Sequence, residues 1–571
     1  MSTFQFPNEQ EATDFASAAS SVFTRTLATR TFELAELTIY DDCAAQASEF
    51  PVLQCVANAL EQGQINNAQD ANTWFLIFAS ALIFFMQAGF AMLCAGSVRI
   101  KNVGNTMLKN LLDACGAAVG FFTIGYAFAF GGQDSTTATT FIGTTNFFMV
   151  GITNQAFWLF QFAFAATSAT ITAGTLAERC QMAAYLCYSV ILTGFVYPVV
   201  AHSIWSNNGF LSAFNVNPFL GIGVIDFAGS AVVHMTGGST AVFATMILGP
   251  RKGRFYDARG NPLPKPKPFP GHSVALQMLG TFILWFGWYG FNPGSALILT
   301  TTLNTGPVAA LAAVNTTISA AVAGTTALFT NLFVEERTTG EAKFDLLSLM
   351  NGCLGGLVAI TAGCAVVEPW AAFVIGLIAG WLYLLSSAAL IRIRLDDAVD
   401  AIPVHLVCGT WGILAVGFLA APDRILAAYG TDEHVGWFYE LARGSFNASL
   451  LGCQIIAIFF VIGWVFFIMF PFFIWLNYMG WFRADSLEEL VGLDISYHGG
   501  GAGGNDEVKL EYVEAFNRRK DNKQNAHSNA QQQEMPQHYA DSYSPQEEAA
   551  MEAMGEDDER GGGMMPNGMV G

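Results

Sequence analysis

The chain has 571 residues, of which 53% are hydrophobic and only 12% are charged, and its mean hydropathy is +0.41. Soluble domains carry about 25% charged residues, so half that fraction over so long a chain argues against a soluble protein. The excess of 45 acidic over 25 basic residues excludes a nucleic-acid binder, which needs a basic face for phosphates. The class that fits is an all-α polytopic membrane protein.

The acidic residues are concentrated at the two ends of the chain. Residues 1–72 contain ten acidic residues and two arginines, and residues 482–571 contain 18 acidic and seven basic residues, whereas residues 73–481 are nearly neutral. We expect an extracellular acidic region over 1–72 and a membrane domain over 73–481. A cytoplasmic segment over 482–504 and a disordered acidic, Gln-rich tail over 505–571 are expected to follow.

The ten cysteines lack the spacing of a zinc or redox motif, so no metal site is expected. Eight of them lie within or beside apolar segments, where cysteine behaves as a small hydrophobic residue. Cys43 and Cys55 lie instead in the polar N-terminal region. A disulfide between them requires that this region faces an oxidising compartment.

Eleven apolar runs follow in chain order, each long enough to cross about 30 Å of hydrocarbon. The last run is long enough to be tilted or to continue past the membrane. The predicted spans are 73–97, 109–130, 155–177, 182–206, 227–250, 273–292, 305–333, 345–365, 369–391, 398–420 and 448–480.

Lysine and arginine predict the orientation of these spans. The loops after the odd-numbered spans 1 to 9 contain 14 basic residues, including Lys109, whereas the loops after the even-numbered spans contain only Arg424 and Arg443. Because basic loops stay in the cytoplasm, we expect an extracellular N-terminus and a cytoplasmic C-terminus.

An internal repeat is predicted from two motifs that lie five spans apart. Span 5 begins with D-F-A-G-S-A-V-V-H (226–234), and span 10 begins with D-A-V-D-A-I-P-V-H (397–405). Spans 1 and 6 share a shorter similarity. Related segments five spans apart have opposite orientations, which is typical of an inverted repeat of spans 1–5 and 6–10 with its site at the midplane.

The motifs place two histidines deep in the membrane. Eight residues at 1.5 Å each predict that His234 and His405 lie about 12 Å along their helices, entering from opposite faces. Ionisable groups at that depth line a pathway or pair with each other. Asp226 and Asp397 are interpreted first as helix caps, and Asp400 is assigned to the same structural class. A direct ion-binding role is the alternative for the capping aspartates.

Aromatic groups gather on the predicted outer side. Trp205 ends span 4, Phe291 and Ser295 end span 6, and Phe160 and Phe164 lie in the outer half of span 3. Aromatic faces attract cations by roughly 2 kcal/mol or more in a desolvated site. The alternative is the ordinary belt of aromatic residues at a membrane interface.

Eight segments match the pattern of a known family. They are Q-A-G-F-A-M-L-C-A-G-S-V-R-I-K-N (87–102), G-Y-A-F-A-F-G-G (125–132), L-A-E-R (176–179), G-F-V-Y-P-V-V-A-H (194–202), D-F-A-G-S-A-V-V-H-M (226–235), F-G-W-Y-G-F-N-P-G-S (286–295), I-T-A-G-C-A-V-V-E-P-W-A-A (360–372) and G-L-D-I-S-Y-H-G-G (492–500). Taken together, they resemble the ammonium transporter/Rhesus family, and specifically its plant-type branch. The resemblance implies an eleven-span fold with an inverted repeat, a homotrimer in the plasma membrane and one narrow pore in each subunit.

The resemblance also implies roles for residues in four groups. They are an outer cation vestibule of Phe164, Trp205 and Ser295 with Asp226 one shell behind; a phenyl gate of Phe160 or Phe164 with Phe291; the pore histidines His234 and His405; and Ser496, which takes the place of a phosphorylated threonine in the cytoplasmic tail. A kinase acting on this tail is the implied partner. A phosphate near Asp494 would add like charge and disrupt packing.

We therefore expect a selective, electrogenic ammonium transporter that works in the lipid bilayer without a cofactor. It would capture the cation outside, deprotonate it near the gate and pass ammonia beneath the histidines. No Walker, GxSxG or HExxH motif suggests an enzyme. The alternatives are a Rhesus-type electroneutral channel for ammonia or carbon dioxide, an ammonium sensor with low flux, and a membrane scaffold that does not transport.

Overall fold

The computed structural model describes residues 51–132, 138–257, 259–299 and 305–499, together with residues 514, 517 and 518. The chain divides into two units, Met1–Thr73 and Trp74–Gly571. Helix α3 (Pro51–Ser97) begins in the first unit, and the remaining helices named below belong to the second. Cys43 and the side chain of Cys55 lie outside the described residues, so the disulfide stays a prediction.

Eleven apolar helical segments confirm the all-α membrane fold. Ten of them in the described ranges are long and apolar enough to cross a membrane, and α12 is a shorter eleventh. In chain order they are α3; α4 (Val103–Gly120) with η3 (Phe121–Gly125) and α5 (Tyr126–Phe130); α6 (Gln155–Thr175); α7 (Met182–Ile191) with η5 (Leu192–Val196) and α8 (Tyr197–Trp205); η7 (Ser230–Met235) with α9 (Thr236–Leu248); α10 (Val274–Gly294); α11 (Gly306–Thr339); α12 (Leu346–Ile360); α13 (Pro369–Arg392); η8 (Ile402–Val407) with α14 (Cys408–Leu419); and α17 (Ser449–Tyr478).

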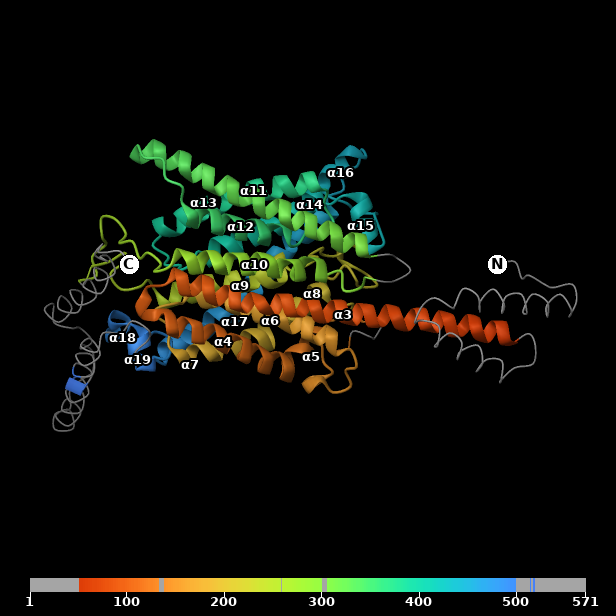
Figure 1. The fold of residues 1–571 in the computed structure, drawn as a ribbon, viewed down its shortest axis with the longest axis horizontal. Helices are drawn as coiled ribbons and strands as arrows, with labels where there is room; N and C mark the ends of the chain where they lie inside the picture. Colours follow the sequence, from red (N-terminus) through yellow and green to blue (C-terminus); the bar gives the residue numbers. More distant parts are fainter. Residues whose placement is uncertain are drawn as a thin grey trace, which may run out of the picture. The chain divides into compact units, whose positions relative to one another are not determined.

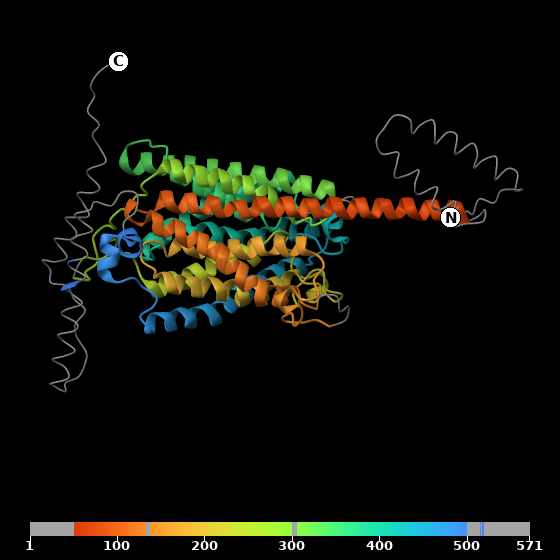
Figure 2. The same ribbon diagram turned by 60° about the horizontal axis from the view of Figure 1, so that its bottom comes forward.

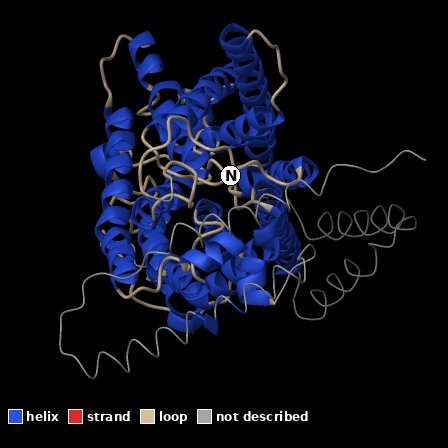
Figure 3. Cartoon of the chain, turned by 90° about the vertical axis from the view of Figure 1, so that its left-hand side faces the viewer, coloured by secondary structure: helices blue, strands red, loops and turns tan. Residues whose placement is uncertain are grey.

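Four short α-helices lie before and after α17: α15 (Pro422–Tyr429), α16 (Trp437–Ala442), α18 (Ser486–Val491) and α19 (Leu493–His498). Figure 3 shows helices joined by loops. Within the described ranges the only β-structure consists of isolated β-bridges. One such bridge joins Cys180 to Arg483, so the segment after α17 returns to the loop that follows α6.

The helices of the second unit run along a common direction, as Figures 1 and 2 show. Helix α11 packs against α12 and α13, α9 packs against α6 and α17, and α4 packs against α6 and α7. The π-helical turns η7 and η8 contact each other between these groups. This contact brings residues 171 positions apart in the chain to one place.

The predicted start of the second span is wrong. Lys109 lies inside helix α4, where it is buried and its Nζ donates to the carbonyl oxygen of Cys180 at 2.6 Å. The second span therefore includes residues that the sequence analysis placed in a loop. A lysine is tolerated there because its ammonium reaches a backbone carbonyl in the connection between α6 and α7.

Candidate functional site

A row of aromatic rings leads into the middle of the bundle. Trp205, at the end of α8, packs edge-on against Phe164 of α6, with ring centroids 5.7 Å apart. Phe164 lies 4.2 Å from Phe291 of α10, and the ring of Phe291 stacks 5.4 Å from that of His234. Trp205 is half-buried, whereas Phe164 and Phe291 are fully buried. The row thus runs from a partly exposed indole to a buried imidazole.

Of the two phenylalanines that compete for the gate position, Phe164 faces Phe291. Phe160 lies one helical turn away, 4.8 Å from Phe164, and packs next to Gly294 of α10. Ser295 directly follows α10, is half-buried, and its hydroxyl donates to the carbonyl oxygen of Phe291 at 2.9 Å. The structure therefore brings together all the outer residues that the sequence singled out.

The two histidines meet at the end of this row. Their Nδ1 atoms lie 3.1 Å apart, and the rings are stacked 5.2 Å apart at 20°. His234 and His405 are both buried. One Nδ1 donates and the other accepts in such a contact, so one proton lies between the two rings. The predicted juxtaposition of the rings is present.

Two residues that the sequence analysis missed hold His234 in place. Its ring stacks on Trp288 at 5.4 Å, and the Trp288 indole nitrogen donates to the Thr361 hydroxyl at 3.1 Å. Among the described residues, Nε2 of His234 has no hydrogen-bond partner. Trp288 precedes Phe291 by three residues and so lies on the same helical face. The three-residue spacing of Trp288 and Phe291 was the sequence signal that could have identified Trp288.

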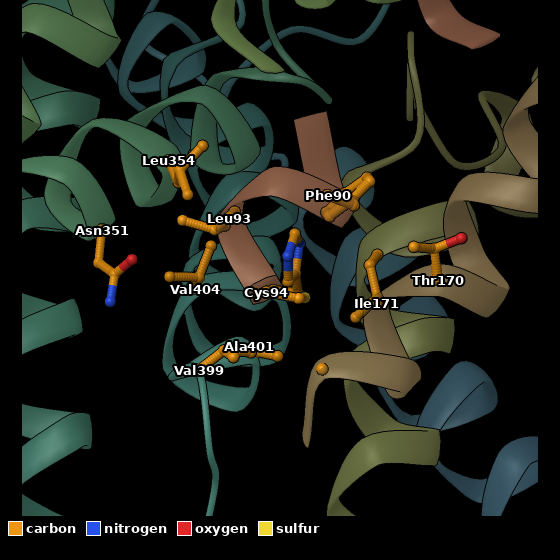
Figure 4. Close-up of a pocket in the computed structure, with 12 residues that line it drawn as sticks. Phe90, Leu93, Cys94, Thr170, Ile171, Asn351, Leu354, Val399, Ala401 and Val404 are labelled. Atoms are coloured by element: carbon orange, nitrogen blue, oxygen red, sulfur yellow. The ribbon is translucent and has the colours of Figure 1, made fainter. Parts of the chain in front are cut away.

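A pocket whose lining includes His405 is drawn in Figure 4. Its wall is mostly apolar, and its polar side chains besides His405 are Cys94, Thr170 and Asn351. The Thr170 hydroxyl donates to Gln87 Oε1 at 2.7 Å, so it is already partnered. The other lining residues are Phe90, Leu93, Ile171, Gly174, Leu354, Val399, Ala401 and Val404. The sequence analysis did not select Phe90 or Asn351, because nothing local to their helices marks them.

Asp226 acts as a cap. Its carboxylate oxygens accept four backbone N–H groups of residues 229–232 at 2.8–3.0 Å. Burial raises its pKa to about 6, although these amides act in the opposite direction. Its backbone carbonyl accepts the Trp205 indole N–H at 2.7 Å. Asp226 therefore positions the outer tryptophan through its main chain, while its carboxylate is directed at amides.

Asp397 is the corresponding cap of the second motif, with fewer bonds. It accepts the N–H groups of Val399 at 3.2 Å and Ile402 at 2.7 Å, and burial raises its pKa to about 6. Asp400 accepts the hydroxyls of Ser387 and Tyr383, each at 3.1 Å, and therefore ties this segment to α13.

The prediction that a continuous helix leads from each aspartate to its histidine is wrong. Residues 226–229 are not helical, and Gly229 has a φ of +108°. Asp400 similarly has a φ of +59° before η8. Because these residues break the helix, η7 and η8 start only about one turn before their histidines. Irregular backbone at membrane depth is tolerated here because it is buried in protein.

Buried ion pairs connect the two histidine spans. Arg251, after α9, contacts Asp396 at 2.9 Å and Glu178 at 3.0 Å, and all three side chains are buried. Arg99 adds a 2.5 Å contact to Glu178. Burial alone would raise the pKa of Glu178, but Arg99 and Arg251 lower it to about 2. The end of the first histidine span is thereby fixed to the start of the second.

The segment after α17 docks on the same end of the bundle. Asp494 of α19 accepts the N–H groups of Gly104 at 2.9 Å and Asn105 at 2.6 Å, and so caps the start of α4. Ser496 is half-buried, and its hydroxyl donates to the Gly492 carbonyl at 3.0 Å. A group added to this hydroxyl would lie two residues from the aspartate that holds α4.

The ammonium transporter family model matches residues 73–502. A curated tomato (Solanum lycopersicum) protein, "Ammonium transporter 1 member 3", is 42% identical over 437 residues, which cover 75% of this chain and 92% of the relative. "Ammonium transporter 3" of Dictyostelium discoideum is 40% identical over 438 residues, covering 76% and 94%.

Solved structures share the fold. A "Sensor Amt Protein" is 32% identical with a TM-score of 0.64, covering 76% of this chain and 99% of that one. Mep2 of Candida albicans is 28% identical with a TM-score of 0.62, covering 73% and 87%. In the described residues, no group of three or more His, Cys, Asp or Glu side chains has the arrangement of a metal site. The sequence, the fold and the paired histidines agree with the family match, and the chain belongs to the ammonium transporter family.

Proposed function

We propose that this protein carries ammonium across a membrane along the row from Trp205 to His405. The observation that supports it most directly is the 3.1 Å contact between the two histidine Nδ1 atoms at the buried end of the aromatic row. The curated relatives are named ammonium transporters, which agrees with this substrate.

In this proposal the cation is captured at the outer end of the row. The rings of Trp205 and Phe164 can offer π-electron faces, and the Ser295 hydroxyl offers one oxygen acceptor. The Phe164–Phe291 pair then closes the way inward, because its rings are 4.2 Å apart and buried. Passage requires these rings to move.

Beyond the gate, the environment favours a neutral species. A bare cation between aromatic rings and apolar side chains loses its hydration, at a penalty of several kcal/mol. Ammonium escapes this penalty by giving up a proton to Nε2 of His234, which lies next to the gate and has no hydrogen-bond partner among the described residues. Potassium cannot do this. Ammonia then passes the histidines, and the proton moves along the Nδ1–Nδ1 hydrogen bond. Transport by this route carries net charge.

Currents in voltage-clamped cells test this proposal. Wild-type protein should give ammonium-evoked currents and no potassium current. His234→Asp should remove the proton-sharing pair and lower the ratio of ammonium to potassium conductance. His272→Ala is the matched control, since that histidine lies outside the row and contacts the Val98 carbonyl. Unchanged selectivity in His234→Asp would contradict the relay.

A sensor is the second candidate function. The similarity to a protein named "Sensor Amt Protein" favours it, as does the docking of residues 493–498 on the start of α4. A sensor would bind ammonium with little flux. Ammonium-dependent growth of transporter-deficient cells separates the two functions, because only a transporter restores growth. A Rhesus-type electroneutral channel would restore growth without currents.

The proposal includes the assembly and its orientation. Without Lys109, which lies in α4, 13 basic residues still follow the odd-numbered spans against two after the even-numbered spans, which supports an extracellular N-terminus and a cytoplasmic C-terminus in the plasma membrane. A homotrimer, and a kinase that modifies Ser496, follow from the family resemblance. The trimer is tested by the mass of the purified full-length protein, and the modification by phosphopeptide mapping with Ser496→Ala as control.

A further inference from the structure

A polar cluster between α4 and α7 is not used by the proposed path. At its centre is Asp113 of α4, which is fully buried. The Tyr185 hydroxyl of α7 donates to Asp113 Oδ2 at 2.5 Å, and the rings of Tyr185 and Tyr188 lie 5.0 Å apart. Ser189, also on α7, lies close to the carboxyl group.

Four oxygen atoms of this cluster form no hydrogen bond of good geometry in the described part of the chain, although Ser189 lies close to Asp113 and Tyr188 lies close to Tyr185. They are Asp113 Oδ1, Asn110 Oδ1, Tyr188 Oη and Ser189 Oγ, and all four residues are buried. An isolated buried polar atom is destabilising by a few kcal/mol. Several such atoms together, from two adjacent helices, are the environment in which ordered water is bound.

The carboxyl group of Asp113 forms no salt bridge among the described residues. Lys109 is the only cationic side chain that faces it among the described residues, and the pair forms no salt bridge. Its Nζ donates to the Cys180 carbonyl and lies 5.5 Å from the Tyr185 ring. The other titratable groups facing the carboxyl are Tyr185, Tyr188 and Cys94. None of these three side chains is cationic, so the buried site favours the neutral form of the carboxylic acid.

The cluster adjoins the pocket whose lining includes His405. Cys94 is part of the pocket wall in Figure 4, and its thiol lies close to the Asn110 side chain. Asn110 and Asp113 are three residues apart on α4 and therefore lie on the same face. Polar groups thus lead from the inner pocket of the path, past Cys94 and Asn110, to Asp113.

We propose that this cluster is a water-filled proton-binding site in which Asp113 takes up a proton from the inner pocket and returns it. Uptake adds the proton to Oδ1 of the carboxylate and gives a neutral carboxyl group, and release restores the carboxylate. Water bound to Asn110, Tyr188 and Ser189 carries the proton between pocket and carboxyl. The role in transport depends on the proposed function, whereas the proton binding itself does not.

Infrared difference spectroscopy of the full-length protein in lipid tests the site without any transport. A protonated carboxylic acid gives a separate C=O stretching band. We expect wild-type protein to show this band near neutral pH, with a shift in D2O, and Asp113→Asn to lack it. Tyr185→Phe should shift the band by removing the 2.5 Å hydrogen bond. Asp257→Asn, at an exposed loop position, is the control and should keep it.

A band that persists in Asp113→Asn, or one that does not respond to D2O, would overturn the site. Ammonium-evoked currents then test its role. Asp113→Asn should shift the pH dependence of the current by about one unit, and Asp113→Glu should restore it. If the band belongs to Asp113 but no variant conducts, the proposed function fails and the site stands. A band at Asp113 with an unchanged pH dependence overturns the role in transport.

Discussion

The two histidine segments differ in how tightly they are held. In residues 226–234, four backbone N–H groups donate hydrogen bonds to one carboxylate, and His234 is enclosed by Trp288 and Phe291. In residues 397–405, only two backbone N–H groups donate such hydrogen bonds, and His405 borders a pocket. Equivalent motifs thus enclose one histidine tightly and leave the other at the wall of a pocket.

The buried contacts that join the halves should show the largest effect. Arg251→Ala leaves Glu178 and Asp396 as buried carboxylates beside the gap, and breaking such an ion pair costs about 3–5 kcal/mol. We expect a large fall in the yield of folded protein and in thermal stability in detergent. Arg259→Ala, an exposed arginine of the same loop, is the control and should behave as wild type.

Acid should weaken the same connection without a substitution. The pKa of Glu178 is about 2 in the folded protein against an ordinary value of 4.5, and that of Asp396 is lowered by Arg179 and Arg251 against the effect of burial. A depressed pKa contributes stability that is complete above about 4.5 and is lost as the pH falls towards 2. Thermal unfolding across this range measures it. Glu178→Gln should flatten the dependence, and an equally steep curve in that variant would contradict the assignment.

The unequal caps predict unequal penalties. An asparagine side chain has one acceptor oxygen where an aspartate has two. Asp226→Asn should therefore lose about two of the four hydrogen bonds from backbone N–H groups, and Asp397→Asn should lose one of its two. At about 1.5 kcal/mol for each bond to a charged group, the first change should destabilise by about 3 kcal/mol and the second by about half as much. Thermal unfolding of both variants compares them directly. Equal losses would show that the halves are held alike.

The smallest effect on stability is expected at Ser295. Its hydroxyl donates only to a carbonyl of its own helix, so Ser295→Ala should change the unfolding temperature little. It removes the oxygen acceptor of the proposed vestibule, so the ammonium concentration at half-maximal current should rise several-fold, as expected for about 1 kcal/mol. Thr325→Ala, whose hydroxyl bonds only to carbonyls of its own helix outside the row, is the control. An unchanged half-maximal concentration would remove Ser295 from the vestibule.

Much of the fold was predictable because a membrane restricts what a chain can do. Backbone groups in hydrocarbon must be satisfied within a helix, so each apolar run of sufficient length became a span, and most boundaries agree within a few residues. The exceptions have local causes. Lys109 entered a helix because its ammonium finds the Cys180 carbonyl, and span 5 starts late because Gly229 and the Asp226 cap interrupt it.

The candidate site divides in the same way. Its histidines, outer aromatic residues and capping aspartates were found from repeated motifs and predicted depth, since those patterns are written along single segments. Trp288, Thr361, Phe90 and Asn351 were not found, because their relation to the histidines exists only across helices. The same is true of Arg251 with Glu178 and Asp396.

The sequence by itself determined the class of the protein, the number of spans and the two histidines, because apolar length and buried ionisable groups are properties of single segments. Only the tertiary structure decided that the two Nδ1 atoms meet and that Phe164 faces Phe291. It also placed the buried Asp113 of α4 against Tyr185 of α7. Side-chain packing between distant helices sets these distances, and no periodicity along the chain encodes it.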